Sequence, residues 1–397
     1  SLSAAGLVLV ALPGDASAQS QGGWRKELAE KAKEAQAAGQ KGNYSEAIRL
    51  LREAKAKAPL SPQEEQGINE LMIWAASGAK DYKLVIATVD ERLETGRVTG
   101  ADLTRKLRLK ATSQYSLRDY RGAAATFDKL AAQGALTADD LTLLATCQMQ
   151  LKDYGRATGT LEKAIAANDK AGRGGKNAAL LEMLNSAYFE TKNDAKRVQV
   201  LHRLMAVAPK ASTFKQLASA YEVSSVKDPV VMVNVYRLGA AKNVLSNEHY
   251  TKYAEAALDL SSPGEAVAML EKGMAAGAIK KDDRNNRILA DAKSQLERVK
   301  TMLPQQEKEA LATKTGEPEA KLATAYFTVK NYPKAAEAAQ RAIAEKNLKR
   351  EDEANMLLGI SLANSKKPAD AKKAFAAAAA ANGGKSKGIA ELWSSLT

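Results

Sequence analysis

The sequence predicts an all-α fold, a solenoid of about ten stacked helical hairpins, and three observations support this fold class. Alanine, the residue with the highest helix propensity, makes up about a fifth of the 397 residues. Aromatic residues make up only 5% of the chain, which is too few for a typical β-sandwich or barrel. A polar turn between two apolar helical patterns recurs roughly every 34 to 40 residues, as in stacked helical pairs.

Residues 1–18 precede the first repeat and read as the C-terminal part of a secretory signal peptide. Leu7 to Leu12 form an apolar stretch that is too short to span a bilayer. Ala16-Ser17-Ala18 is a small-x-small cleavage pattern before Gln19. We therefore expect export to the periplasm of a Gram-negative bacterium. The alternative is a flexible apolar N-terminus on a cytoplasmic protein.

Residues 19–282 read as repeats 1–7, and each repeat consists of two helices around a short turn. The turn typically ends in tyrosine, with a small residue three positions later, as in Tyr44 and Ala47. The clearest turns along the whole chain are Gly42-Asn43-Tyr44, Lys80-Asp81-Tyr82, Arg118-Asp119-Tyr120, Lys152-Asp153-Tyr154 and Lys330-Asn331-Tyr332. This spacing, with an apolar helical pattern on each side of the turn, predicts stacked helical hairpins.

These units resemble the tetratricopeptide repeat (TPR), a helix–turn–helix family with small residues where helices touch. The first unit matches at Ala35, Tyr44, Ala47, Leu51, Ala54 and Pro59. The ninth matches at Leu322, Ala323, Tyr326, Tyr332, Ala335, Ala339 and Ala342, and the tenth at Leu358, Gly359, Ala371, Phe375 and Ala378. The resemblance implies a right-handed superhelix whose first helices line a concave face that holds an extended peptide or a helix.

The C-terminal third is less regular. Residues 283–314 contain no recognisable turn, so they are either a degenerate repeat with longer helices or a long-helix insertion. We expect one continuous superhelix, whereas a break at this stretch would give two subdomains. Residues 315–380 form repeats 9 and 10. Residues 381–397 are expected to form a capping helix, with Ile389, Leu392 and Trp393 over the last apolar face.

The sequence predicts no catalytic, metal or cofactor site, and therefore no enzyme. It has one cysteine and two histidines, too few for the usual metal or nucleophile clusters. We expect Cys147 to be buried and inert, His202 to lie in a core or interface, and His249 to be solvated. Gly384-Lys385-Ser386 ends like a phosphate-binding loop, but Ala379 replaces the required glycine.

The net charge is +13, and the basic residues are scattered along every repeat. Nucleic-acid binding would favour a concentrated basic stripe, so no nucleic-acid partner is expected. A diffuse positive field suits acidic polysaccharide or lipid headgroups, although a solvated basic face is an equally good interpretation.

Eight residues on the predicted first helices are candidates for partner binding. They are Trp74, Arg105, Arg108, Thr112, Tyr115, Gln150, Phe189 and Tyr221. Arg105 and Arg108 are three residues apart on one helix, so together they could clamp a carboxylate or phosphate. Trp74, Tyr115 and Tyr221 are candidate aromatic anchors, and the alternative for each is packing inside the array.

The function predicted from these features is a non-catalytic periplasmic scaffold that binds one or more envelope proteins in its groove. We expect no transmembrane span and no cofactor. One alternative is a binder of an acidic envelope polymer, such as peptidoglycan or a polysaccharide. Another is an accessory subunit of an envelope export complex or a TonB-type complex.

Overall fold

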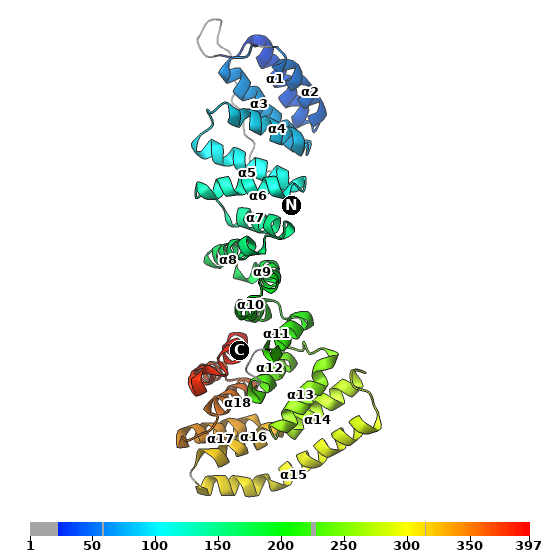
Figure 1. Cartoon of the computed structure of the whole chain (residues 1–397), viewed down its shortest axis with the longest axis vertical. Coiled ribbons are helices and arrows are strands. Elements are labelled where there is room, and N and C mark those ends of the chain that lie inside the picture. The colour runs from blue at the N-terminus through cyan, green and yellow to red at the C-terminus, as the bar shows by residue number, and fades with distance from the viewer. Residues whose placement is uncertain (1–22, 58, 224–227, 314) are drawn as a thin grey trace. The chain divides into compact units, whose positions relative to one another are not determined.

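The computed structural model describes residues 23–57, 59–223, 228–313 and 315–397, so the expected signal segment 1–18 lies outside it. These residues form twenty α-helices and two short 3₁₀ helices, with no strand among them (Figure 1). The all-α prediction is therefore confirmed. The chain divides into two compact units, Ser1–Thr191 and Lys192–Thr397, which we call the N-terminal and C-terminal units. This division falls after α9 rather than within 283–314, where the sequence suggested a possible break.

The N-terminal unit is a series of antiparallel helical pairs followed by a single helix. Its elements are α1 (Lys26–Gln40), α2 (Tyr44–Lys55), α3 (Pro62–Gly78), α4 (Tyr82–Glu94), α5 (Gly100–Ser116), α6 (Tyr120–Ala132), α7 (Ala138–Gln150), α8 (Tyr154–Lys170), η1 (Gly174–Lys176) and α9 (Ala178–Glu190). Each helix packs on the one that follows it in sequence, and α1 also contacts α3, as α5 contacts α7.

The recurring turn tripeptide has a direct structural explanation. Its first residue, such as Lys80 with φ of 56° or Gly42 with φ of 81°, is left-handed and ends the first helix. Its second residue caps the next helix: the Asp81 carboxylate accepts a hydrogen bond from the Leu84 amide at 3.1 Å. The tyrosine is then the first residue of that helix.

Small residues allow consecutive pairs to approach closely. Ala32, Ala35 and Ala47 are fully buried in the first core cluster. A Cβ atom built on Gly78 would lie 2.3 Å from the Tyr44 ring, so the tyrosine of one pair packs on a glycine of the next. Substitution of that glycine would force the two pairs apart.

The C-terminal unit contains eleven α-helices in its described residues. They are α10 (Asp194–Val207), α11 (Ala211–Val223), α12 (Pro229–Ala241), α13 (Asn247–Asp259), α14 (Pro263–Ala275), α15 (Asp283–Thr313), α16 (Gly316–Thr328), α17 (Tyr332–Glu345), α18 (Glu351–Asn364), α19 (Pro368–Ala380) and α20 (Lys387–Leu396), with η2 (Ala381–Gly384) before α20.

The stretch without a turn is one helix of 31 residues, α15, and not a degenerate pair. Only Ala292 and Ala310 of this helix are fully buried, so most of its surface faces solvent. Its neighbours α14 and α16 touch directly: the Gly264 amide donates to the Thr328 hydroxyl at 2.7 Å. A Cβ atom at Gly264 would lie 1.9 Å from the Thr328 carbonyl oxygen, so this crossing requires glycine.

The last helix does more than cover the final repeat. Trp393 of α20 stacks on Phe375 of α19, with ring centroids 5.8 Å apart. Its indole nitrogen also donates to the carbonyl oxygen of Asn234 in α12 at 3.0 Å. Lys242, just after α12, donates to the Leu396 carbonyl oxygen at 3.0 Å. The end of the C-terminal unit therefore packs back onto its beginning.

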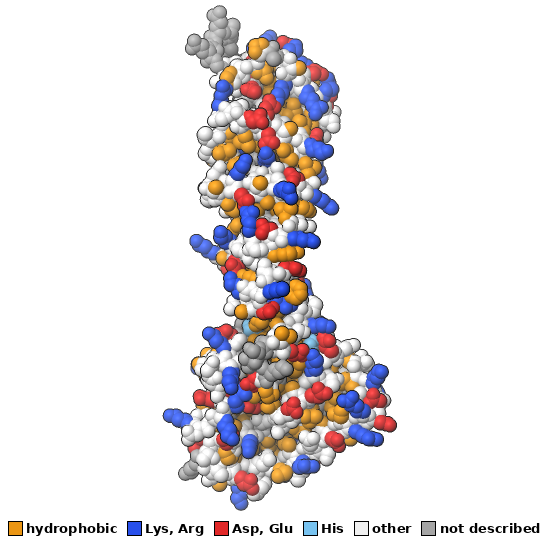
Figure 2. All heavy atoms as spheres, in the orientation of Figure 1, with side chains coloured by type: hydrophobic (Ala, Val, Ile, Leu, Met, Phe, Trp, Pro, Cys, Tyr) orange, Lys and Arg blue, Asp and Glu red, His pale blue; other side chains and the backbone are white. Residues whose placement is uncertain are grey.

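Charged side chains of both signs are mixed over the surface. Figure 2 shows Lys and Arg interspersed with Asp and Glu on the face in view. Many charged side chains among the described residues form ion pairs, such as Lys110 with Asp90 and Arg156 with Asp128. On this face the net positive charge is not gathered into one patch.

Candidate partner-binding site

Trp74 is engaged in packing between the first two helical pairs. Its ring lies over Gly39 of α1, where a Cβ atom would approach the indole to 2.4 Å. It also meets Tyr44 edge-on, with ring centroids 5.9 Å apart. These contacts favour the packing interpretation of Trp74 over that of a partner anchor.

Arg105 and Arg108 lie on α5 as predicted, but their guanidinium groups do not converge. Arg108 binds Asp140 of α7 at 2.9 Å and donates to the Ala135 carbonyl oxygen at 2.8 Å. Arg105 turns to Asp102 of its own helix at 2.7 Å and remains 55% exposed. This geometry does not support a two-arginine clamp, because Arg108 already holds the buried Asp140 carboxylate.

Thr112 and Tyr115 contribute little free polar surface. The Thr112 hydroxyl donates to carbonyl oxygens of its own helix, Arg108 and Leu109, at 3.0 Å each. Tyr115 is half-buried against the core and meets the Tyr120 ring edge-on at 5.9 Å. Gln150 and Phe189, in contrast, are exposed at the ends of α7 and α9, and Phe189 is 59% exposed.

Tyr221 belongs to the C-terminal unit and lies beneath α20. Its hydroxyl is 2.9 Å from the Nε2 atom of His202, and a Cβ atom on Gly388 would approach that hydroxyl to 2.8 Å. Burial raises the pKa of Tyr221 and lowers the pKa of His202 to about 4. The pair is therefore neutral near pH 7 and holds the last helix in place.

The other two candidate reactive residues are also buried. Burial raises the pKa of the Cys147 thiol to about 11, in accord with the expected buried, inert cysteine. The expectation for His249 is wrong, because its ring is only 2% exposed. Its Nδ1 atom accepts from the Ser246 amide at 3.2 Å, which caps α13, and the ring packs on Phe214. The described residues contain no His, Cys, Asp and Glu group with the geometry of a metal site.

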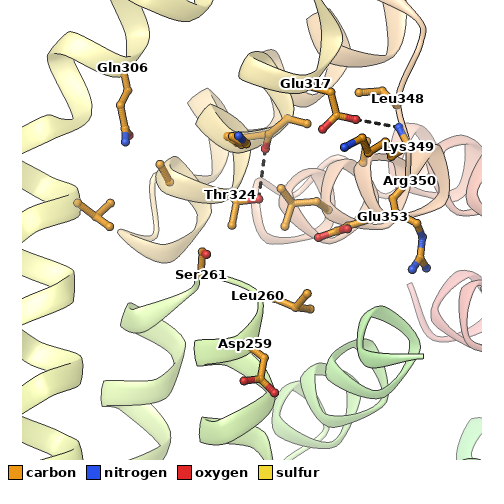
Figure 3. A pocket seen from close by; sticks show the side chains of 17 residues that line it. Asp259, Leu260, Ser261, Gln306, Glu317, Thr324, Leu348, Lys349, Arg350 and Glu353 are labelled. Carbon is orange, nitrogen blue, oxygen red and sulfur yellow. Dashed lines mark hydrogen bonds between the residues drawn. The ribbon is translucent and has the colours of Figure 1, made fainter. Parts of the chain in front are cut away.

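The C-terminal unit contains a pocket of about 530 Å³ (Figure 3). It lies between α16 and α18, the first helices of two consecutive pairs, and is bordered by α15 and the turn that joins α13 to α14. Its apolar lining residues are Leu260, Val299, Ala320, Ala323, Ala325, Leu348, Ala354 and Leu357. Its charged lining residues are Asp259, Glu317, Lys321, Lys349, Arg350 and Glu353.

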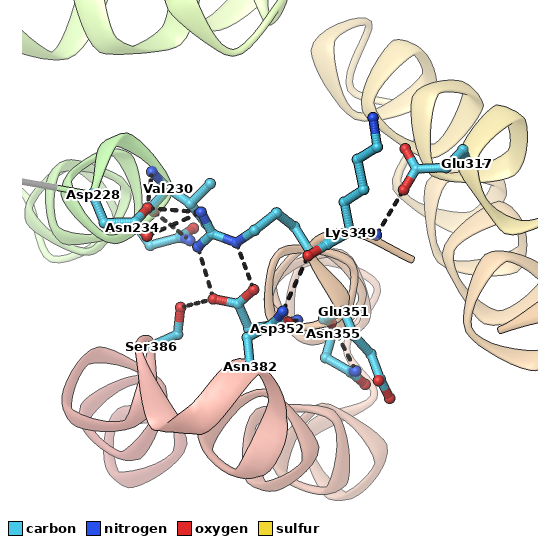
Figure 4. A network of polar contacts seen from close by, with 11 residues as sticks. Asp228, Val230, Asn234, Glu317, Lys349, Glu351, Asp352, Asn355, Asn382 and Ser386 are labelled. Carbon is cyan, nitrogen blue, oxygen red and sulfur yellow. Dashed lines mark hydrogen bonds and ion pairs between the residues drawn. The ribbon is translucent and has the colours of Figure 1, made fainter. Parts of the chain in front are cut away.

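Arg350, which lines this pocket, takes part in a network of polar contacts around Asp228 and Asp352 (Figure 4). Its Nε atom donates to Asp352 at 2.8 Å, and its Nη1 atom donates to Asp228 at 3.0 Å. Asp352 also accepts the hydroxyl of Ser386, at the start of α20, at 2.7 Å. This network joins α12, α18 and α20 and so holds Arg350 in place where it lines the pocket.

The side chain of Glu353 is different, because it forms no hydrogen bond or ion pair with any described residue. It is half-buried on α18 and extends into the space that Thr324 and Leu260 border in Figure 3. Burial raises the pKa of its carboxyl group, and the nearby Arg237 and Arg350 only partly oppose this. A ligand cation in the pocket would supply the missing partner.

Comparison with known proteins identifies the repeats. Residues 108–172 and 320–386 match the family model described as the tetratricopeptide repeat, one region in each unit. The chain therefore contains tetratricopeptide repeats (TPRs) in both units. Proteins of this fold are generally non-catalytic scaffolds for protein–protein interaction.

Two solved structures are similar to this chain at low sequence identity. The Naa15/Naa10 structure bound to HypK-THB is 16% identical over 90% of this TPR chain and 59% of its own, with a TM-score of 0.39. A TPR protein from Parabacteroides merdae is 13% identical over 68% of this chain and all of its own, with a TM-score of 0.36. This chain thus spans less than two thirds of the first of these. A comparison with curated proteins finds no match.

No helix in the described part of the TPR chain has the length and apolarity needed to cross a membrane.

Sequence reasoning did not single out Glu353, because one acid among 46 carries no local signal. It also missed Lys106, whose 2%-exposed side chain binds Glu70 across α3 and α5 at 2.5 Å. The signal that was available is a lysine within the apolar pattern of α5, between Arg105 and Leu107.

Proposed function

We propose that this TPR protein is a non-catalytic scaffold that holds a segment of a partner protein against its first helices. The observation that carries the proposal is the pocket between α16 and α18, which combines an apolar lining with charged side chains. Pockets of this composition bind ligands by burying apolar groups and orienting them through a few polar contacts.

A second surface in the N-terminal unit supports the same function. Arg105, Gln150 and Phe189 are exposed on α5, α7 and α9, the first helices in that unit's order of pairs. The other five predicted residues, Trp74, Arg108, Thr112, Tyr115 and Tyr221, are only partly exposed. We therefore keep Arg105, Gln150 and Phe189 as the candidates for a contact on this unit, with Phe189 as its apolar anchor.

We further propose that the protein works in the periplasm and that its partners are envelope proteins. The support is the short apolar stretch and the small-x-small pattern of residues 1–18. Service to an envelope export or TonB-type complex is one form of this proposal.

Binding of an acidic envelope polymer remains the second candidate, favoured by the net charge of +13. Mixed charges on the face in Figure 2 give it less support than the pocket gives the scaffold. The two functions differ in salt dependence, because charge-driven polymer binding should collapse as ionic strength rises.

Cross-linking in the cells that produce the protein, followed by affinity purification and mass spectrometry, tests the scaffold. Thr324→Phe would fill the pocket from α16, and Thr301→Phe is the matched control on α15. Both hydroxyls donate to a carbonyl oxygen one turn back, at 3.2 and 2.9 Å, but Thr301 does not line the pocket. We expect one protein to be lost with Thr324→Phe and retained with Thr301→Phe. If both variants recover the same proteins as the wild type, the pocket is not the binding site.

A further inference from the structure

We propose that the pocket between α16 and α18 selects a lysine or arginine side chain of the partner segment and pairs it with Glu353. The inference rests on the proposed scaffold function and specifies its chemistry. Three features of the pocket support this inference: the ion pairs of the charged groups around it, its apolar lining residues, and the exposed lysines Lys321 and Lys349.

The arginines near Glu353 are already paired with other carboxylates. Arg237 is buried and binds Glu265 at 2.6 Å, while Arg350 bridges Asp228 and Asp352. Neither guanidinium hydrogen-bonds to Glu353. A half-buried carboxylate without a hydrogen-bond donor has lost part of its hydration, and no protein hydrogen bond compensates for that loss. A ligand group that donates a hydrogen bond to it would therefore bind favourably.

The balance of charge around Glu353 favours a cation over an anion. Two arginines, Arg237 and Arg350, form ion pairs with three carboxylates, those of Glu265, Asp228 and Asp352. Glu353 adds a fourth carboxylate to this group, which leaves an excess of two negative charges. A ligand ammonium or guanidinium would reduce that excess in a partly desolvated site, where charge-assisted hydrogen bonds are strong.

The remaining lining matches the rest of a basic side chain. Leu260, Ala320 and Leu357 present apolar surface for a methylene stem. Lys321 and Lys349 are exposed at the pocket, and neither ammonium group forms an ion pair with a described residue. They would favour acidic residues next to the inserted basic residue. The favoured segment is therefore a basic residue flanked by acidic ones.

Fluorescence anisotropy with the full chain tests this specificity. One probe is fluorescein-labelled Gly-Glu-Ala-Arg-Ala-Glu-Gly, and the second has glutamine in place of the central arginine. We expect the arginine probe to bind about tenfold more tightly, the effect of one charge-assisted pair. Glu353→Gln should abolish this preference. Glu351→Gln should retain it, because Glu351 lies on the same helix but is exposed and does not line the pocket.

A second variant covers the case in which Glu353→Gln does not fold. Thr324→Phe fills the pocket while Glu353 itself is unchanged, and it should also abolish the preference. Equal binding of both probes to the wild type, including no binding of either at millimolar concentration, would overturn the inference. So would a preference that survives both variants, or tighter binding of a probe with a central glutamate.

The inference and the proposed function can fail separately. If the Glu353→Gln variant still cross-links to the same cellular protein as the wild type, the scaffold stands and basic-residue selection is wrong. If the wild type cross-links to no protein, the scaffold proposal itself is wrong. Preference for the arginine probe would then describe a pocket without a protein partner.

Discussion

The buried ion pair between Arg237 and Glu265 should make the C-terminal unit sensitive to the loss of one carboxylate. Glu265 accepts three hydrogen bonds from Arg237, at 2.6, 3.0 and 3.3 Å, and one from the Tyr253 hydroxyl at 2.6 Å. The pair joins α12 to α14, and the Arg237 side chain is only 6% exposed. Glu265→Ala would leave the guanidinium buried without its counter-ion.

The expected loss is about 3 kcal/mol, the lower end of the range for breaking one partner of a buried pair. The lower end applies because Arg237 keeps a hydrogen bond to Asn234 at 3.0 Å and lies 4.8 Å from the centre of the Phe327 ring. The exposed pair of Lys293 and Glu271, with side chains 52% and 51% exposed, provides the control. Glu271→Ala should cost less than about 1 kcal/mol.

The loss should depend on pH in a defined direction. Burial tends to raise the pKa of Glu265, but Arg237 outweighs it, so the net effect lowers the pKa in the folded protein. The pair therefore contributes stability above the unfolded pKa of about 4.3, and this contribution falls as pH drops through the lower folded pKa. The wild type should approach the stability of Glu265→Ala only in acid.

Urea unfolding followed by tryptophan fluorescence measures both effects. The chain has three tryptophans, and Trp393 reports on the C-terminal unit alone after Trp24→Phe and Trp74→Phe. A loss for Glu265→Ala no larger than that for Glu271→Ala would refute the reasoning. A loss that stayed constant from pH 7 to acid would refute its electrostatic part.

Three further predictions use contacts elsewhere in the chain. Gly359→Ala should cost about 1–3 kcal/mol in thermal or urea unfolding, because its Cβ would lie 2.5 Å from the Phe375 ring. Gly155→Ala in α8, with nothing within 4 Å, should be neutral or stabilising. Trp393→Ala should lower the free energy of unfolding by about 3–5 kcal/mol and should raise hydrogen exchange in α12 as well as in α19. Faster exchange confined to α19 would contradict the packing of α20 on α12. Cys147 should resist iodoacetamide at pH 8 unless the chain is unfolded, because burial raises the pKa of its thiol to about 11. Rapid labelling of the native protein would count against the burial of Cys147.

The helical pairs could be predicted because their signals are local. Lys330 and Asn331 end one helix and cap the next within a few residues, so the turn is visible in the sequence. The absence of such a turn in 283–314 likewise corresponds to the single helix α15. The sequence left a degenerate pair as an alternative, and the structure shows that α15 continues through Pro304, a residue that normally interrupts a helix.

The contacts of α20 and the state of each candidate site residue could not be predicted this way. The bond from Trp393 to Asn234 joins residues 159 positions apart, and no local pattern encodes it. Arg105 and Arg108 share a helix, but Arg108 reaches Asp140 on α7, which depends on how two helices are aligned. Glu353 stands out only once its neighbours are seen to be paired elsewhere.

Site-specific photo-cross-linking would show whether a partner protein occupies the pocket between α16 and α18. Lys321→Cys places a benzophenone maleimide at the pocket, and Thr301→Cys places it on the solvent-facing side of α15, while the buried Cys147 should stay unlabelled. In the cells that produce the protein, or in their extracts, we expect one protein to cross-link to position 321 and not to position 301. The cross-linked segment of that protein should contain a basic residue. The same products from both positions, or none from 321, would contradict this expectation.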